Sequence, residues 1–119
     1  MFRSALFLIA ACALLASAGQ AKDLESDAPA SIDGARQAQL IRMVRQDCGS
    51  CHGIQLTGGL GPALTRERMA EIPLDNLVAV IYQGRPGTPM PGWKTMISEA
   101  DAEWIAHQLQ AGFPLDTRH

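Results

Sequence analysis

The chain has 119 residues, enough for one small domain, and a formal net charge of −2 at pH 7. Ten basic and twelve acidic residues leave no basic patch for nucleic acid and no strong net field for long-range steering. Three cysteines, of which two lie close together, exclude a disulfide-rich scaffold.

The N-terminus has the pattern of a secretory signal peptide. Arg3 supplies a positive charge, an apolar run covers residues 5–16, and small or polar residues cover 17–21. We expect cleavage after Ala21, with cleavage after Ala18 as the alternative. The apolar run is too short to span a bilayer comfortably, and no later run approaches its length. These features predict export to the periplasm without a stable membrane anchor.

Removal of residues 1–21 also removes Cys12, which we interpret as an apolar residue of the leader and not as a lipid-attachment site. Residues 22–33 are polar and acidic, and we expect them to form a flexible tail. The single domain then covers residues 34–119, in which acidic and basic side chains balance.

The domain begins with a predicted helix over residues 34–46, capped by Asp33. We expect this helix to end just before Cys48. Its apolar positions recur at helical spacing and are Leu40, Ile41 and Val44, with Met43 beside them.

Residues 48–52 read Cys-Gly-Ser-Cys-His, the C-x-x-C-H signature for attachment of c-type haem. Two thiols at this spacing can form thioethers with the two vinyl groups on one edge of a porphyrin. His52 then lies under the iron as an axial ligand. The sequence therefore favours one covalent haem c, attached through Cys48 and Cys51.

A thiol redox pair and half of a zinc site also contain C-x-x-C. The chain shows no βαβ pattern of the kind that carries a redox pair. A structural zinc site needs four ligands, and few others are present. Outside the motif, the cysteines and histidines are Cys12, His107 and His119.

A glycine-rich loop is expected over residues 53–64. Thr65 then caps a short helix that runs to Ile72, with its charged residues exposed. Pro73 ends this helix, because proline cannot continue the hydrogen-bond pattern.

A further helix begins at Leu74 or Asp75 and ends at Gly84, which we expect in a left-handed cap. Residues 78–81 also fit a strand, but the chain offers no second strand to pair with them. We therefore favour the helix.

Residues 85–93 contain three prolines and two glycines, which exclude regular structure. Ser98 caps a last helix that runs to about Ala111, with acidic residues in its first turn. Gly112 and Pro114 stop it. The apolar face of this helix consists of Trp104, Ile105 and Leu109. The whole pattern predicts an all-α domain.

A six-coordinate haem needs a second axial ligand opposite His52. The candidates besides Met90 are Met43, Met69, Met96, His107 and His119. Met43 and Met69 fall in helical patterns, where a role in core packing is the simpler interpretation. Met90 lies between Pro89 and Pro91, and prolines reduce the entropy that is lost in holding a weak thioether ligand. We therefore predict Met90.

The order and spacing of three motifs resemble a class I, monohaem cytochrome c. These are C-x-x-C-H at 48–52, Gly-Pro at 61–62 and Met-Pro at 90–91. The resemblance covers residues 34–112. It implies helices packed around one haem in a cleft, with the first helix crossing the last, and His/Met ligation. It also implies that the carbonyl of Pro62 accepts a hydrogen bond from the proximal histidine and orients its ring.

Residues 81–93 and 99–109 resemble the small periplasmic cytochromes c-55X that accompany dissimilatory nitrite reductase in denitrifying bacteria. Similar loops occur in cytochrome subunits of other respiratory enzymes. The family often has an aromatic residue near the position of Gln108. We expect Trp104, one turn earlier, to take that packing role.

A saturated His/Met haem gains and loses single electrons without binding a substrate. We therefore predict a monomeric electron carrier and not an enzyme. The resemblance implies that it serves nitrite reductase, either as electron donor or in maturation of its haem. The alternative is a haem enzyme or gas sensor with an open sixth position, for which Tyr82, Arg85 or Trp93 would be distal groups. Against it, we see no further catalytic constellation.

Overall fold

The computed structural model describes residues 31–114, which are helical and contain no strand. Its elements are α1 (Gly34–Met43), the π-helical turn η1 (Val44–Cys48), α2 (Gly49–His52), α3 (Arg66–Ala70), α4 (Leu74–Gln83) and α5 (Glu99–Ala111). This confirms the all-α prediction. None of these helices combines the length and apolar character that crossing a membrane requires. The predicted signal peptide, its cleavage site, Cys12, most of the expected tail and His119 lie outside the described residues.

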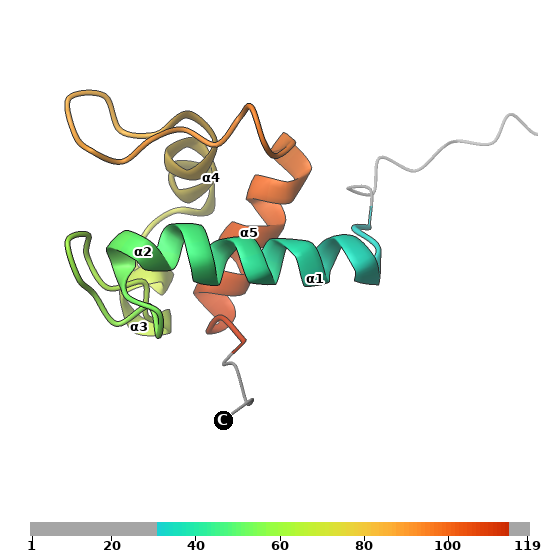
Figure 1. Cartoon of the computed structure of the whole chain (residues 1–119), viewed down its shortest axis with the longest axis horizontal. Coiled ribbons are helices and arrows are strands. Elements are labelled where there is room, and N and C mark those ends of the chain that lie inside the picture. Colours follow the sequence, from blue (N-terminus) through green and yellow to red (C-terminus); the bar gives the residue numbers. More distant parts are fainter. Residues whose placement is uncertain (1–30, 115–119) are drawn as a thin grey trace, which may run out of the picture.

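The first helix begins as predicted but does not end where we expected. The Asp33 carboxylate accepts a hydrogen bond of 2.8 Å from the backbone N–H of Arg36. The expected end before Cys48 is wrong, because helical backbone continues through η1 and α2 to His52 (Figure 1). No glycine or proline interrupts residues 35–48, so nothing in the sequence stops the helix. Gly53, with a φ of +86°, ends it.

The middle helices follow the prediction in place and differ in their ends. Thr65 occupies the N-cap position of α3 without a side-chain hydrogen bond, and the helix ends at Ala70, before the predicted Ile72. Residues 78–81, which also fitted a strand, lie within helix α4 (Leu74–Gln83). Gly84 follows it with a φ of 78° and a ψ of −173°, which is not the expected left-handed helical conformation.

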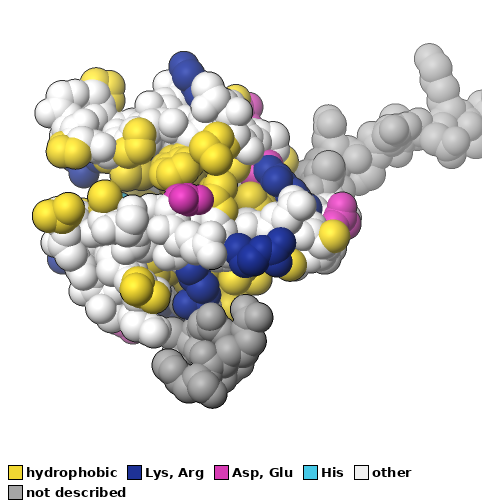
Figure 2. All heavy atoms as spheres, viewed as in Figure 1, with side chains coloured by type: hydrophobic (Ala, Val, Ile, Leu, Met, Phe, Trp, Pro, Cys, Tyr) yellow, Lys and Arg dark blue, Asp and Glu magenta, His cyan; other side chains and the backbone are white. Residues whose placement is uncertain are grey.

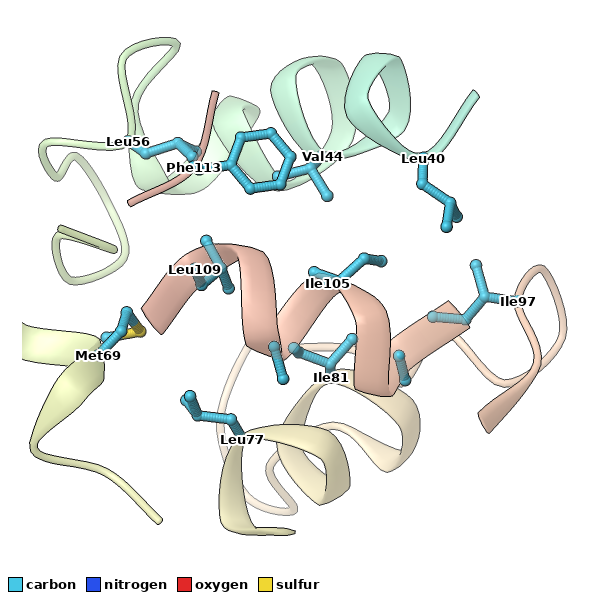
Figure 3. Close-up of a cluster of buried hydrophobic side chains, with 12 residues drawn as sticks. Leu40, Val44, Leu56, Met69, Leu77, Ile81, Ile97, Ile105, Leu109 and Phe113 are labelled. Carbon is cyan, nitrogen blue, oxygen red and sulfur yellow. The ribbon is translucent and has the colours of Figure 1, made fainter. Parts of the chain in front are cut away.

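Helix α5 begins and ends as predicted, and the core forms around it. Ser98 and Asp101 form a capping box at its start. Figure 3 shows the buried side chains of α1 on one side of α5 and those of α4 on the other. The labelled core residues from α1, η1, α4 and α5 are Leu40, Val44, Leu77, Ile81, Ile105 and Leu109. This packing joins the helical segment that carries C-x-x-C-H to the helix that precedes the Met90 loop.

Candidate functional site

The C-x-x-C-H motif lies on helical backbone. Cys48 is the last residue of η1, and Cys51 and His52 end α2. Both cysteines are free thiols; Cys48 is half-buried and Cys51 is exposed. Residues three positions apart share one side of a helix, so the two thiols are available to one common partner.

The environment of Cys48 does not suit a thiol redox centre. Its burial, with a smaller contribution from the charge of Asp47, raises the pKa of the Cys48 thiol to about 11. Reactive cysteines instead have lowered pKa values and sit in electropositive surroundings. The raised pKa of the Cys48 thiol therefore disfavours the thiol redox alternative. Within residues 31–114, no three His, Cys, Asp or Glu side chains gather as a metal site.

The imidazole of His52 is buried and oriented by the backbone. Its Nδ1 lies 2.6 Å from the carbonyl oxygen of Pro62. Because a carbonyl oxygen only accepts, the proton of this hydrogen bond sits on Nδ1. In the neutral imidazole this tautomer leaves Nε2 free to bind a metal.

Gly61 completes the support of the His52 ring, and sequence reasoning missed this contact. A Cβ at Gly61 would lie 2.7 Å from the ring carbon Cε1, so the position has room only for glycine. The N–H of Gly61 also donates to the carbonyl oxygen of Cys51 at 2.8 Å. The signal in the sequence was a glycine directly before the predicted orienting proline, Pro62.

The loop after His52 is fixed by one buried side chain and by hydrogen bonds to the motif. Leu56 has a φ of +57°, the one positive value among the described non-glycine residues. Such a conformation costs roughly 1–2 kcal/mol, and burial of the Leu56 side chain offsets the cost. The N–H of Gly58 donates to the carbonyl oxygen of His52 at 2.8 Å. The loop is thereby held against the end of α2.

Met90 is half-buried in the loop between α4 and α5. Its carbonyl oxygen accepts from the N–H of Arg85 at 3.1 Å, and its own N–H donates to Oγ1 of Thr88 at 3.3 Å. In Figure 1 this loop and the α2 end of the first helical segment lie toward the same side of the molecule. The backbone of Met90 is therefore held in a closed, hydrogen-bonded loop.

The base of the Met90 loop is pinned to the end of α4. The backbone N–H groups of Trp93 and Lys94 donate to the carbonyl oxygens of Ile81 and Tyr82 at 3.2 and 3.0 Å. Gly92 makes this approach possible, since a Cβ there would lie 2.5 Å from the carbonyl carbon of residue 83. The position of the loop thus follows from backbone contacts.

The competing ligand candidates have other surroundings. Met69 is 4% exposed and belongs to the core, as its helical position predicted. Met43 is half-buried against the same core, and Met96 is 60% exposed. His107 is exposed on α5, with Nε2 lying 3.9 Å from a carboxylate oxygen of Glu103. Their surroundings differ from the closed loop that frames Met90.

An open sixth position would have Tyr82, Arg85 or Trp93 as its distal groups. Tyr82 and Trp93 are half-buried, and Arg85 is exposed. The indole Nε1 of Trp93 is buried and is the one such side-chain nitrogen or oxygen in the described residues without a hydrogen-bond partner. A buried unpaired donor costs about 1–3 kcal/mol, so we expect an acceptor there from a bound cofactor or a water molecule.

These features fit a covalently attached haem. The chain presents two free cysteines on one side of a helix, an imidazole whose Nε2 is available, and a thioether in a rigid loop. The orphaned indole N–H of Trp93 adds a donor that the protein atoms leave unsatisfied. Thiol, imidazole and thioether together are the donor set of a c-type haem.

Comparisons with known proteins agree with this assignment. The family model described as cytochrome C oxidase, cbb3-type, subunit III matches residues 35–107. Cytochrome c55X of Stutzerimonas stutzeri is 53% identical over 79 residues, which cover 66% of this chain and 70% of the relative. A solved structure titled c-type cytochrome NirC is 52% identical with a TM-score of 0.66, over 67% of this chain and 94% of that chain.

A second solved structure is titled dihydro-heme d1 dehydrogenase NirN in complex with DHE. It is 31% identical with a TM-score of 0.56, over 65% of this chain and 17% of that chain. The likeness therefore concerns one part of a much larger protein.

Proposed function

The chain belongs to the class I cytochromes c, in the family described as cytochrome C oxidase, cbb3-type, subunit III, and on this premise we propose that it is an exported single-electron carrier with His/Met ligation. Haem c is its covalent cofactor. When bound, this group supplies a one-electron couple between ferric and ferrous iron.

In this proposal Cys48 and Cys51 would hold the haem through thioethers, and His52 would bind its iron. The contact of 2.6 Å between Nδ1 of His52 and the Pro62 carbonyl is the observation that carries the proposal. It fixes the tautomer, directs Nε2 away from the backbone, and raises the basicity of the ring as a ligand. Pro62 is thus the residue that orients His52.

Met90 is the proposed distal ligand. A thioether is a weak donor, so the protein must hold it in place, and the hydrogen bonds of Met90 to Arg85 and Thr88 support this role. Thioether ligation favours the ferrous state and raises the reduction potential. A ligand held in this way would fill the sixth position of the iron, and this supports an electron carrier over an open-site enzyme or gas sensor.

The physiological setting that we propose is denitrification in the periplasm. Relatives named cytochrome c55X and a neighbour named NirC support a redox role linked to nitrite reductase. The protein would pass electrons to that enzyme or serve the maturation of its specialised haem. The likeness to a dihydro-heme d1 dehydrogenase supports the second possibility. The signal-peptide pattern supports export, and we propose that the carrier acts as a monomer.

Stopped-flow mixing of the reduced holoprotein with purified oxidised nitrite reductase tests the proposal. We expect oxidation of the cytochrome at a rate that rises linearly with enzyme concentration. A Met90→Ala holoprotein, measured in parallel, should differ from wild type in its rate of electron transfer. It should also differ in the reduction-potential difference that drives the transfer. Absence of transfer from wild-type protein would exclude the donor role. Ready binding of carbon monoxide by reduced wild-type protein would favour an open sixth position instead.

A further inference from the structure

The structure contains a cleft of about 490 Å³ between η1, the loop after His52, the start of α3 and the end of α5. Sites for small molecules usually measure about 300–1,000 Å³. Leu56, Leu64 and Phe113 supply apolar lining, and Leu56 and Phe113 are seen beside each other in Figure 3. None of the four residues proposed to hold the haem lines this cleft, so its occupancy is separable from haem binding.

Arg45 brings a positive charge to the cleft from η1. Its side chain is half-buried, and the central carbon of its guanidinium lies 5.8 Å from the centroid of the Phe113 ring. The face of an aromatic ring attracts a guanidinium and so restricts where it lies. The charge of Arg45 is therefore held against the apolar lining of the cleft.

Arg66 brings a second positive charge from the first residue of α3. A Cβ on Gly112 would lie 3.7 Å from both Cβ and Cδ of Arg66, so the stem of this side chain runs along the backbone next to Phe113. Figure 2 shows dark-blue Lys and Arg side chains near one another along and below the first helical segment. Arg45 and Arg66 thus approach the same short segment, residues 112–113, from two different helices.

The positive charges of the cleft exceed the negative ones. Within residues 31–114 the ion pairs are those of Arg36 with Asp101 and of His107 with Glu103, and neither involves a cleft residue. Glu67 is the one acidic residue in the described lining, against two arginines.

Uncharged polar groups add further hydrogen-bonding capacity. Thr57 and Thr65 line the cleft, and the Thr65 hydroxyl makes no capping hydrogen bond to α3. Guanidinium groups with hydroxyl donors beside them match the oxygens of a carboxylate or a phosphate.

We propose that this cleft binds a small organic anion, in which a carboxylate or phosphate group is joined to a flat apolar body. The oxyanion pairs with Arg45 and Arg66, and the apolar body covers the lining at Leu56, Leu64 and Phe113. Burial of the apolar body removes surface from water, and the arginines select for charge. The site goes beyond the proposed electron-carrier function and does not depend on it.

The test titrates the reduced holoprotein with four probes and follows the backbone amide signals of Thr57, Thr65 and Gly112 by NMR. The probes 2-naphthoate and 1-naphthyl phosphate carry an apolar body with one or the other oxyanion. Inorganic phosphate lacks the apolar body, and 2-naphthol lacks the strong negative charge. At least one naphthyl anion should bind about tenfold more tightly than both of the other probes. Failure of both naphthyl anions to shift these signals would overturn the proposal.

Substitutions then assign the binding to the cleft. Arg45→Gln and Arg66→Gln should each weaken binding of the naphthyl anion about threefold to tenfold. The matched controls are Arg42→Gln and Arg68→Gln, at exposed arginines that do not line the cleft, and they should stay within about twofold of wild type. An equal loss of affinity in the controls would show attraction to general surface charge only, and would overturn the proposal.

Two acidic residues provide tests of opposite outcome. Glu67→Gln should tighten binding by about twofold or more, because it removes a like charge from the lining. Asp116 follows the lining residue Pro114 by two positions in the sequence. Asp116→Asn should leave the affinity within about twofold of wild type. A gain of about tenfold in that variant would make the chain's own carboxylate the partner of the arginines and overturn the proposal. Unchanged visible spectra establish that each variant is folded around its haem.

Discussion

Arg36 and Asp101 form a bidentate ion pair that joins helix α1 to the start of helix α5. Nε of Arg36 donates to Oδ1 of Asp101 at 3.1 Å, and Nη2 donates to Oδ2 at 2.7 Å. The same carboxylate accepts a hydrogen bond of 2.9 Å from the N–H of Ser98. Because α1 continues into the C-x-x-C-H motif and α5 packs against α4, this pair links the His52 side of the site to the Met90 side.

Arg36→Ala should lower the free energy of unfolding by about 1–3 kcal/mol, since it leaves the buried carboxylate of Asp101 without its main partner. This loss of unfolding free energy is smaller than that for a fully buried ion pair, because the Arg36 side chain is 35% exposed. Arg36→Lys should recover only part of the lost unfolding free energy, because a lysine ammonium cannot form a bidentate pair with a carboxylate. Denaturant unfolding followed by circular dichroism measures the change. Arg42→Ala, exposed on the same helix, should stay within about 0.5 kcal/mol of wild type.

The contribution of Asp101 should depend on pH. The side-chain hydrogen bond from Arg36, foremost among several causes, lowers the pKa of Asp101 from 3.8 to about 2. A lowered pKa gives stability that is fully present above the unfolded-state value and is lost as pH falls through the folded-state value. The difference in unfolding free energy between wild type and Asp101→Asn should therefore shrink between about pH 4 and pH 2. A difference that stays constant over this window would contradict the assignment.

Local signals in the sequence predicted most of the helices, because caps and breakers act within a few residues. Ser98 and Asp33 sit at the helix starts where the sequence placed them. The ion pair of Arg36 and Asp101 joins residues 65 positions apart, so no local pattern could reveal it. The expected end before Cys48 was wrong because no glycine or proline in residues 35–48 marks a stop.

The sequence predicted those parts of the candidate site whose spacing is set by covalent attachment to a porphyrin. The positions of Cys48 and His52 follow from the geometry of a porphyrin edge, and the place of Pro62 followed from family resemblance. The exclusion of any side chain at Gly61 required knowledge of where the His52 ring lies. The hydrogen bond from the N–H of Gly61 to the carbonyl oxygen of Cys51 likewise cannot be read from composition.

Gly61→Ala should disturb the proximal side of the site. The new Cβ would lie 2.7 Å from Cε1 of His52, so the ring must rotate or the loop must move. Either change weakens the hydrogen bond to the Pro62 carbonyl and lowers the basicity of the ligand. The visible spectrum and the reduction potential of the holoprotein report this. Gly34→Ala is the control, because nothing lies within 4 Å of a Cβ there, and it should leave both measurements unchanged.

Cys48→Ala and Cys51→Ala should each leave at most one thioether and little mature holoprotein. The physical reason is that each thiol can bind only one vinyl group of the porphyrin. Mass spectrometry of the acid-treated protein measures the covalent haem. Wild-type protein should carry one porphyrin mass and no free thiol. Full, acid-stable haem in either variant would show that attachment does not use both cysteines.

Met90→Ala should remove the distal ligand. Oxidised wild-type protein should show the weak far-red absorption of an iron–thioether bond, and the variant should lose this band. Its reduction potential should fall, because water or a nitrogen donor favours the ferrous state less than a thioether does. The reduced variant should also bind carbon monoxide.

Met96→Ala and Met69→Ala are the controls for this ligand assignment. Met96 is largely exposed and Met69 is packed in the core, so neither substitution should abolish the far-red band. Met69→Ala should lower stability by about 2–5 kcal/mol through the cavity that it leaves, which separates packing from ligation. Loss of the band in Met96→Ala, with retention in Met90→Ala, would transfer the ligand role to Met96. The hydrogen-bonded frame of Thr88 and Arg85 around Met90 is the physical reason to expect the opposite result.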